Sequence, residues 1–155
     1  MEQKTNHASV IVNPFVIYLG LAIVAILLQK ILPLSFMSEI SARVLGVSLL
    51  ILNLGFGLPA LRGMLQAKTS PNPKRPTTSL VLSGVYRLTR NPMYIGLTLI
   101  FAGLLTYFQV SWGLLLVPLV VWLITIWVIN PEEKYLGEKF GEEYLQYKST
   151  VRRWI

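Results

Sequence analysis

The sequence predicts an all-α integral membrane protein with four transmembrane helices, and three observations support this fold class. Of its 155 residues, 54% are hydrophobic and only 14% are charged, and the mean hydropathy is +0.58, which is unusual for a soluble domain of this size. Its apolar stretches approach the ~20 residues that a helix needs to cross a bilayer. None of them carries a charged residue at its centre. The chain is therefore predicted to form one membrane domain over residues 1–155, with spans at 14–32, 42–61, 92–110 and 112–129.

Local signals delimit the first two spans. A polar to mixed lead-in, residues 1–13, precedes the first span, and Pro33 breaks the chain after it. Gly55, Gly57 and Pro59 interrupt the second apolar stretch, where they are expected to thin or kink the helix. The first span is not expected to be a signal peptide, because it has no basic segment before it and no small-residue cleavage site after it.

A proline-rich loop, residues 62–91, separates the second and third spans. Pro71, Pro73 and Pro76 lie close together, and this spacing excludes a regular helix there. We therefore expect an extended loop.

The third and fourth spans are predicted to form a helical hairpin. Asn91 is a suitable N-cap and Pro92 suits the first helical position, while residues 107–111 form a short turn between the spans. Asn130 and Pro131 repeat the same start signal, so the sequence predicts a break there and a new helix.

The C-terminal tail, residues 131–155, is predicted to be helical and amphipathic. Glu132, Leu136 and Phe140 share one face at spacings of four residues. Gly141 is expected to end this first segment of the tail.

The net charge of +7 indicates the orientation in the membrane. Between the second and third spans the chain carries basic residues and no acidic one, and the positive-inside rule places such a loop in the cytoplasm. With four spans, both termini are then cytoplasmic, and we expect a bacterial inner-membrane protein. The bilayer explains the basic loop, so nucleic acid is not an expected partner. The basic residues of the loop are Arg62, Lys68, Lys74, Arg75, Arg87 and Arg90.

The residue inventory restricts the chemistry. The chain has no cysteine and one histidine, His7, in the polar lead-in. Thiolate nucleophiles, cysteine-bound metal centres, a histidine-rich metal site and a Ser-His-Asp triad are therefore excluded. No metal is expected.

The first polar cluster lies where the third span begins. Asn91 and Pro92 open a helix whose unpaired first-turn N–H groups, together with the helix dipole, favour an anion. Arg87 and Arg90 add positive charge beside it. This arrangement indicates either a docking site for a carboxylate or phosphate, or only helix capping next to cytoplasmic charge.

The second polar cluster follows the fourth span. Glu133 stands three residues after Asn130, the capping-box position, and is expected to cap the helix. Glu132 leads the apolar face, so it should point inward and have a cationic partner, either Arg90 or Arg87 or a bound cation. We favour Glu132 as the functional acid of the pair.

Two tyrosines are candidate site residues. Tyrosines at a membrane surface commonly form an interfacial belt. Tyr86 and Tyr94, however, flank Arg90 within the first polar cluster, where an aromatic face can contact a cationic group.

Four motifs, in this order, resemble the superfamily of isoprenylcysteine carboxyl methyltransferases and phospholipid N-methyltransferases, which are integral membrane enzymes. The agreement in order and spacing extends from about residue 69 to residue 153, and the first two spans match only in hydropathy. The motifs are a Leu-Val-x-Ser-Gly-x-Tyr run at 80–86, an Arg-His/Asn-Pro-x-Tyr-x-Gly signature at 90–96, a Glu-Glu pair at 132–133, and a Phe-Gly-Glu-Glu-Tyr-x-x-Tyr-Lys tail at 140–148.

The resemblance implies S-adenosylmethionine as methyl donor and a lipophilic or lipid-headgroup acceptor at the cytoplasmic membrane face. In-line transfer from a sulfonium has a good leaving group, and placement alone supplies about 7–11 kcal/mol, so histidine and cysteine are not needed. We predict Glu132, Tyr94 and Arg90 as catalytic residues. By motif position, the implied cofactor contacts are Thr78, Ser79, Leu80, Val81, Tyr86, Asn91, Pro92, Met93, Tyr94, Glu132 and Glu133.

Two departures from the resemblance bear on the acceptor. Asn91 stands where the prenylcysteine enzymes have histidine, and Val128 stands where they carry a substrate-binding arginine. Both argue against a prenylcysteine carboxylate as the methyl acceptor.

Two other functions stay open at this point. One is an NADPH-dependent, reductase-like member of the same superfamily, and the other is a small four-span transporter or assembly subunit without enzymatic activity.

Overall fold

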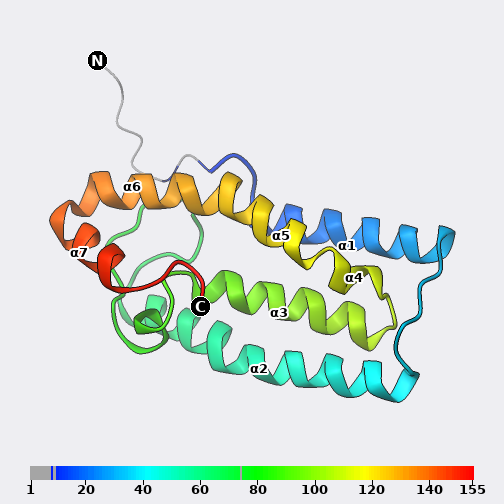
Figure 1. The fold of residues 1–155 in the computed structure, drawn as a ribbon. Helices are drawn as coiled ribbons and strands as arrows, with labels where there is room; N and C mark the ends of the chain where they lie inside the picture. Colours follow the sequence, from blue (N-terminus) through cyan, green and yellow to red (C-terminus); the bar gives the residue numbers. More distant parts are fainter. Residues whose placement is uncertain (1–7, 9, 74) are drawn as a thin grey trace.

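The structure is a computed structural model that describes residue 8, residues 10–73 and residues 75–155. Within these ranges the chain is helical and contains no strand (Figure 1). The predictions that concern His7 and Lys74 fall outside the described residues. The elements are α1 (Pro14–Ile31), α2 (Glu39–Gln66), the 3-10 turn η1 (Gly84–Arg87), α3 (Pro92–Tyr107), α4 (Trp112–Leu115), α5 (Val117–Ile124), the π-helical turn η2 (Thr125–Ile129), α6 (Asn130–Phe140) and α7 (Glu142–Thr150).

The long helices lie side by side, with α3 between α2 and the other helices (Figure 1). The main core joins α1, α3, α5 and η2, and α2 packs against the remaining side of α3. Tyr18 of α1 links α1 to α3 within this core. Its hydroxyl donates to the carbonyl oxygen of Tyr94 at 3.1 Å and lies 2.9 Å from the hydroxyl of Thr98. The buried core residues are Ile17, Tyr18, Ala25, Tyr94, Phe101, Leu105, Val120, Ile124, Val128 and Ile129.

Within the described residues, three helical stretches are long and apolar enough to cross a membrane. They are Pro14–Ile31, Glu39–Gln66 and Trp112–Phe140. Helix α3 is apolar but has 16 residues, which gives it a length of about 24 Å against a hydrocarbon core of about 30 Å. The all-helical membrane architecture is thus confirmed, whereas the count of four spans stays a prediction.

Helix α2 is longer than its sequence predicts. It continues past residue 61 to Gln66 with Pro59 inside it, so neither this proline nor the glycines near it end the helix. A proline is tolerated inside a membrane helix when packed neighbours hold the backbone. Here α2 packs along α3 over much of its length.

Glycines bring the backbones of α2 and α3 into direct contact. A Cβ atom added at Gly46 would lie 2.7 Å from the backbone nitrogen of Tyr107 and 2.8 Å from the carbonyl oxygen of Gly103. Small residues permit such close approach between membrane helices, where packing drives association. Gly55, on the same helix, has no atom within 4 Å of the corresponding position.

These contacts predict opposite effects for two matched substitutions. Gly46→Ala is expected to destabilise the fold by about 1–3 kcal/mol, because the added methyl meets backbone atoms that cannot move aside. Gly55→Ala is expected to be neutral or stabilising by up to about 1 kcal/mol, because alanine favours the helix and meets nothing. Thermal unfolding of the two variants in the same detergent would measure the difference. Equal stabilities would contradict the close contact.

The predicted break at Asn130 and Pro131 is wrong. Asn130 has helical angles (φ −59°, ψ −48°), and the chain passes from α5 into α6 through the π-helical turn. Pro131 has no N–H to donate to the carbonyl of Trp127, one turn earlier. That carbonyl accepts a hydrogen bond from the N–H of Ile11 at 3.0 Å instead. A contact from the lead-in therefore replaces the lost helical bond, and the helix continues.

Several segments gather at one end of the bundle (Figure 1). The proline-rich loop is non-helical over residues 69–73 and 75–78, as predicted, and its described part meets the beginning of α3 and the α6–α7 pair at this end. Gly141 (φ +54°) ends α6, as expected, and lets the chain turn back into α7. The tail then crosses the beginning of α3, where the N–H of Arg90 donates to the carbonyl of Arg152 at 2.9 Å.

Candidate functional site

A cavity of ≈ 590 Å³ lies at this end of the bundle. Its volume falls within the range typical of small-molecule sites. Its wall comes from the lead-in and the beginning of α1, from α2, the proline-rich loop and η1, and from the beginning of α3, α6 and α7. The predicted site residues that line it are Ser79, Leu80, Val81, Tyr86, Arg90, Asn91, Pro92, Met93, Tyr94, Glu132 and Glu133.

Thr78 is the predicted contact that does not line the cavity. Its hydroxyl donates to the carbonyl of Lys68 at 2.8 Å, and its N–H donates to the hydroxyl of Thr69 at 3.1 Å. Ser79 makes a similar bond to the carbonyl of Ala67 at 2.7 Å. These bonds fasten the loop to the end of α2, so Thr78 supports the wall from outside.

Glu132 is half-buried and faces the cavity from the beginning of α6. The hydroxyl of Tyr94 donates to its Oε2 at 2.9 Å. Tyr94 is itself buried and held by Tyr18 through its carbonyl. Neither Arg90 nor Arg87 pairs with Glu132, and in the described part of the chain this carboxylate forms no ion pair. The arrangement therefore fixes a carboxyl group at the cavity wall without a basic partner among the described residues.

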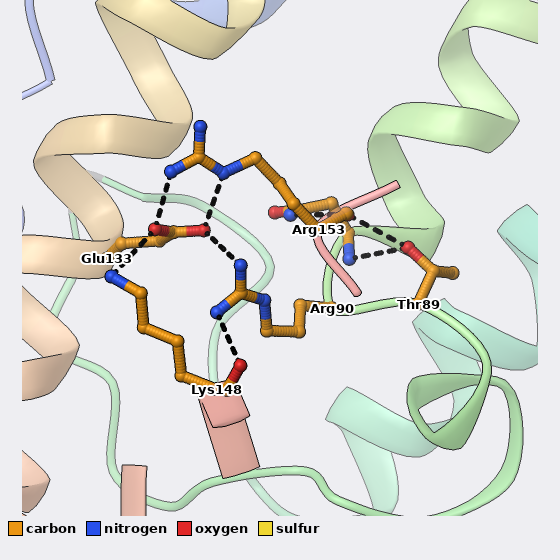
Figure 2. Close-up of polar contacts among 6 residues, drawn as sticks. Thr89, Arg90, Glu133, Lys148 and Arg153 are labelled. Carbon is orange, nitrogen blue, oxygen red and sulfur yellow. Dashed lines mark hydrogen bonds and ion pairs between the residues drawn. The ribbon is translucent and has the colours of Figure 1, made fainter. Parts of the chain in front are cut away.

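Glu133 does not cap the helix, contrary to its capping-box spacing. Figure 2 shows three basic side chains converging on its buried carboxylate. Arg153 binds both oxygens, at 2.9 Å through Nε and 2.8 Å through Nη2, while Arg90 and Lys148 each approach to 3.2 Å. The hydrogen bond to Glu133 raises the pKa of the Arg153 guanidinium, which keeps its charge. These contacts hold the Glu133 carboxylate inside the protein, away from the exposed backbone N–H groups that it was expected to cap.

The beginning of α3 differs from a simple capped helix. The side chain of Asn91 makes no capping bond, and its Nδ2 donates to the carbonyl of Arg153 at 2.9 Å. The carbonyl of Asn91 accepts from the N–H groups of Tyr94 and Ile95. Since Pro92 has no N–H, most donors of the first turn are already used or absent. The helix end alone is therefore a weaker anion site than its sequence suggests.

Three tyrosines from two segments, Tyr86 of η1 and Tyr144 and Tyr147 of α7, line the cavity. Tyr147 of α7 donates its hydroxyl to the carbonyl of Tyr86 at 2.7 Å, and Tyr144 is buried beside it, with ring centroids 6.2 Å apart. Burial raises the pKa of Tyr147 to about 12, so this phenol keeps its proton at neutral pH. All three line the cavity together with Glu132.

Sequence reasoning missed three contributors. Arg153 lies beyond the tail motif at 140–148 and was not predicted as a site residue, yet it fixes both Glu133 and Asn91. Tyr144 lies within the tail motif at 140–148 but was not predicted as a site residue. Asn53 lies inside an apolar run of α2 and is one of the residues that line the cavity. A polar residue within a membrane helix was the signal that could have identified it.

Chemically, the site suits a ligand with a positive charge and a flat or apolar body. The carboxylate of Glu132 can balance a cation, the tyrosine rings offer aromatic faces, and the other walls are mainly apolar. In the residues that the structure describes, no group of three His, Cys, Asp or Glu side chains is placed to hold a metal ion.

The phospholipid methyltransferase family matches residues 41–143, which run from the first turn of α2 into α7. The chain belongs to this family. In this phospholipid methyltransferase family member, the matched region includes both polar clusters and most of the cavity wall.

The proteins similar in sequence to this family member include the following two. An uncharacterized protein of Haemophilus influenzae is 40% identical over 63 residues, which are 41% of this chain and the whole of that protein. Protein-S-isoprenylcysteine O-methyltransferase of Saccharomyces cerevisiae is 36% identical over 80 residues, 46% of this chain. These residues are 30% of the yeast enzyme, so the chain matches less than a third of that protein. No solved structure matches the chain.

Proposed function

We propose that this member of the phospholipid methyltransferase family transfers a methyl group from S-adenosylmethionine to a lipophilic or lipid-headgroup acceptor. The observation that carries the proposal is Glu132, a carboxylate that faces a ligand-sized cavity, is fixed by Tyr94 and has no ion pair among the described residues. The family match and the similarity to an isoprenylcysteine methyltransferase support the same reaction class.

The residues present suit this methyl donor. S-adenosylmethionine carries a sulfonium and an ammonium group, for which Glu132 offers the opposite charge. Its adenine is a flat ring, and Tyr86, Tyr144 and Tyr147 place aromatic side chains around the same cavity. Its carboxylate suits the surplus of positive charge around Glu133, where three basic side chains meet one acid.

When bound, the donor supplies a methyl group on a positively charged sulfur that departs as a neutral thioether. The protein then needs mainly to hold and orient, which supplies about 7–11 kcal/mol of the barrier reduction. Glu132 holds the cation and Tyr94 fixes the direction of the carboxylate. Arg90 is bound to Glu133, so we assign it a positioning role at the beginning of α3. The apolar wall keeps water from the reacting groups.

We also propose the membrane placement that the sequence predicts. Four helices, with α3 as the short one, cross a bacterial inner membrane, and the proline-rich loop and both termini lie in the cytoplasm. The basic residues of the loop favour this orientation. The cavity would then open at the cytoplasmic face, where a soluble donor and a membrane-borne acceptor can meet.

Calorimetry on the detergent-purified protein tests the proposal. S-adenosylmethionine and S-adenosylhomocysteine are expected to bind with micromolar affinity, and NADPH is expected not to bind. A cooperative thermal unfolding transition shows that the purified protein is folded. If such protein binds neither adenosyl compound, the proposed function is overturned. Binding of NADPH in their place would favour a reductase-like member of the superfamily.

A further inference from the structure

A groove of ≈ 420 Å³ lies outside the site described above. It is formed by Phe56 of α2, by the end of η1 with the residue that follows it, and by the C-terminal residues. Arg87 and Arg152 line this groove, and neither of them lines the main cavity. The sequence suggested that Arg87 supports an anion at the beginning of α3, so its charge lies at a different place from the expected one.

The two arginines of the groove are unpaired within the described part of the chain. Neither guanidinium forms an ion pair or a hydrogen bond there, whereas Arg90 and Arg153 both bind Glu133. Arg87 and Arg152 are exposed, and no acidic side chain of the described residues lines the groove. A guanidinium offers N–H donors in a planar fork that matches a phosphate group. The groove therefore has the charge and the donors for a phosphate.

Hydrogen bonds hold the two walls of the groove against each other. The N–H of Arg90 donates to the carbonyl of Arg152 at 2.9 Å, and the hydroxyl of Tyr147 donates to the carbonyl of Tyr86 at 2.7 Å. These two bonds join the C-terminal segment to the chain on either side of Arg87. The backbones that carry the two arginines are thus fixed relative to each other before any ligand binds.

The groove lies near the level at which the hydrocarbon core of a membrane ends. Residues 44–61 of α2 carry no charge and extend for about 27 Å, close to the hydrocarbon thickness of about 30 Å. Phe56 precedes Arg62, the first charged residue after this stretch, by about 9 Å along the axis. Leu88 and Ile155 also line the groove and are 66% and 77% exposed. Exposed apolar residues therefore adjoin the arginines at the depth of lipid head groups.

We propose that this groove binds an anionic phospholipid, with Arg87 and Arg152 on its phosphate and its acyl chains against Phe56 and Leu88. A zwitterionic phospholipid also has a phosphate, but its ammonium group offsets the attraction to two unpaired guanidinium groups. Free phosphate would leave the exposed apolar residues uncovered. The groove shares no lining residue with the main cavity, so this lipid is not the methyl acceptor and the inference is independent of the proposed function.

Native mass spectrometry of the full chain in detergent tests this inference. Phosphatidylglycerol is expected to bind about tenfold more tightly than phosphatidylcholine. The double variant Arg87→Gln/Arg152→Gln is expected to bind phosphatidylglycerol at least about tenfold more weakly than the wild type, because it loses charged hydrogen bonds to the phosphate. Thermal unfolding gives a second readout, since phosphatidylglycerol should raise the melting temperature of the wild type more than that of this variant.

A matched control separates the groove from general attraction to a basic surface. Arg62→Gln/Arg75→Gln removes the same charge at two exposed positions that line neither the groove nor the main cavity. This variant should bind phosphatidylglycerol like the wild type, and cooperative unfolding of both double variants would show that they are folded. Equal losses in the two double variants, or equal binding of the two lipids by the wild type, would overturn the inference.

Inorganic phosphate distinguishes a lipid from a free anion. An equal concentration of inorganic phosphate should leave phosphatidylglycerol binding unchanged, because it lacks the acyl chains. Full suppression of lipid binding under this condition would show a site for a free anion and overturn the lipid assignment. Binding of S-adenosylhomocysteine is measured separately on the same preparations, so failure of the lipid site leaves the proposed function unaffected.

Discussion

Glu133→Gln is expected to lower the melting temperature of the protein by on the order of 10 °C. The substitution leaves Arg90 and Arg153 facing each other without the carboxylate that both bind. Removing one partner of a buried ion pair costs about 3–5 kcal/mol, because the remaining charges stay desolvated and unpaired. The side chain of Glu133 is 6% exposed, so water cannot replace the lost contacts. Thermal unfolding in detergent measures the shift.

The control for this prediction lies on the same helix. Lys134 and Glu138 approach to 4.0 Å, with side chains 80% and 62% exposed, and such surface pairs contribute little. Lys134→Ala is therefore expected to leave the melting temperature almost unchanged. If Glu133→Gln were as mild as Lys134→Ala, Glu133 would not stabilise the tail.

Glu132→Gln is expected to weaken S-adenosylhomocysteine binding only modestly and S-adenosylmethionine binding by at least about 30-fold, because loss of a buried charge partner costs about 2–5 kcal/mol. Only S-adenosylmethionine has the sulfonium charge, so the difference between the two ligands reports on that contact. Glutamine retains an oxygen that can accept from Tyr94, so the cavity wall should keep its shape. Calorimetry with both ligands gives the two affinities.

Glu143→Gln is the matched control for the second prediction. Glu143 is exposed on α7 and does not line the cavity, so its neutralisation should change neither affinity. Equal losses for both ligands in Glu132→Gln would place the contact on the ammonium group that they share. Unchanged affinities would remove Glu132 from the donor site.

Local signals in the sequence were sufficient to predict a helix boundary where no distant segment competes with them. Residues 14–32 were predicted as a span, and α1 runs from Pro14 to Ile31, because Asn13 caps the helix and Pro14 suits its first turn. Gly141 ends α6 for a similarly local reason, since its positive φ favours glycine.

Predictions failed where a distant segment competes with a local signal. Asn130 and Pro131 resemble a helix start, yet the N–H of Ile11 satisfies the carbonyl that the proline leaves free. Glu133 has capping-box spacing, yet Arg153 lies twenty residues further on and binds it on two oxygens. Partners at such separations follow from the tertiary arrangement of the segments. The packing of Asn53 depends on a distant segment in the same way, because its amide oxygen lies beside Gly57 of its own helix and Gly96 of α3.

The binding of Arg153 to Glu133 and Asn91 also has a consequence for biosynthesis. Chains are made from the N-terminus, and earlier segments fold first. Helices α1 to α5 can enter the bilayer while the tail is still unmade, but the polar end of the cavity has all its contacts only after residue 153 emerges from the ribosome. A nascent chain arrested before that residue would be inserted in the membrane, yet its cavity would still be incomplete.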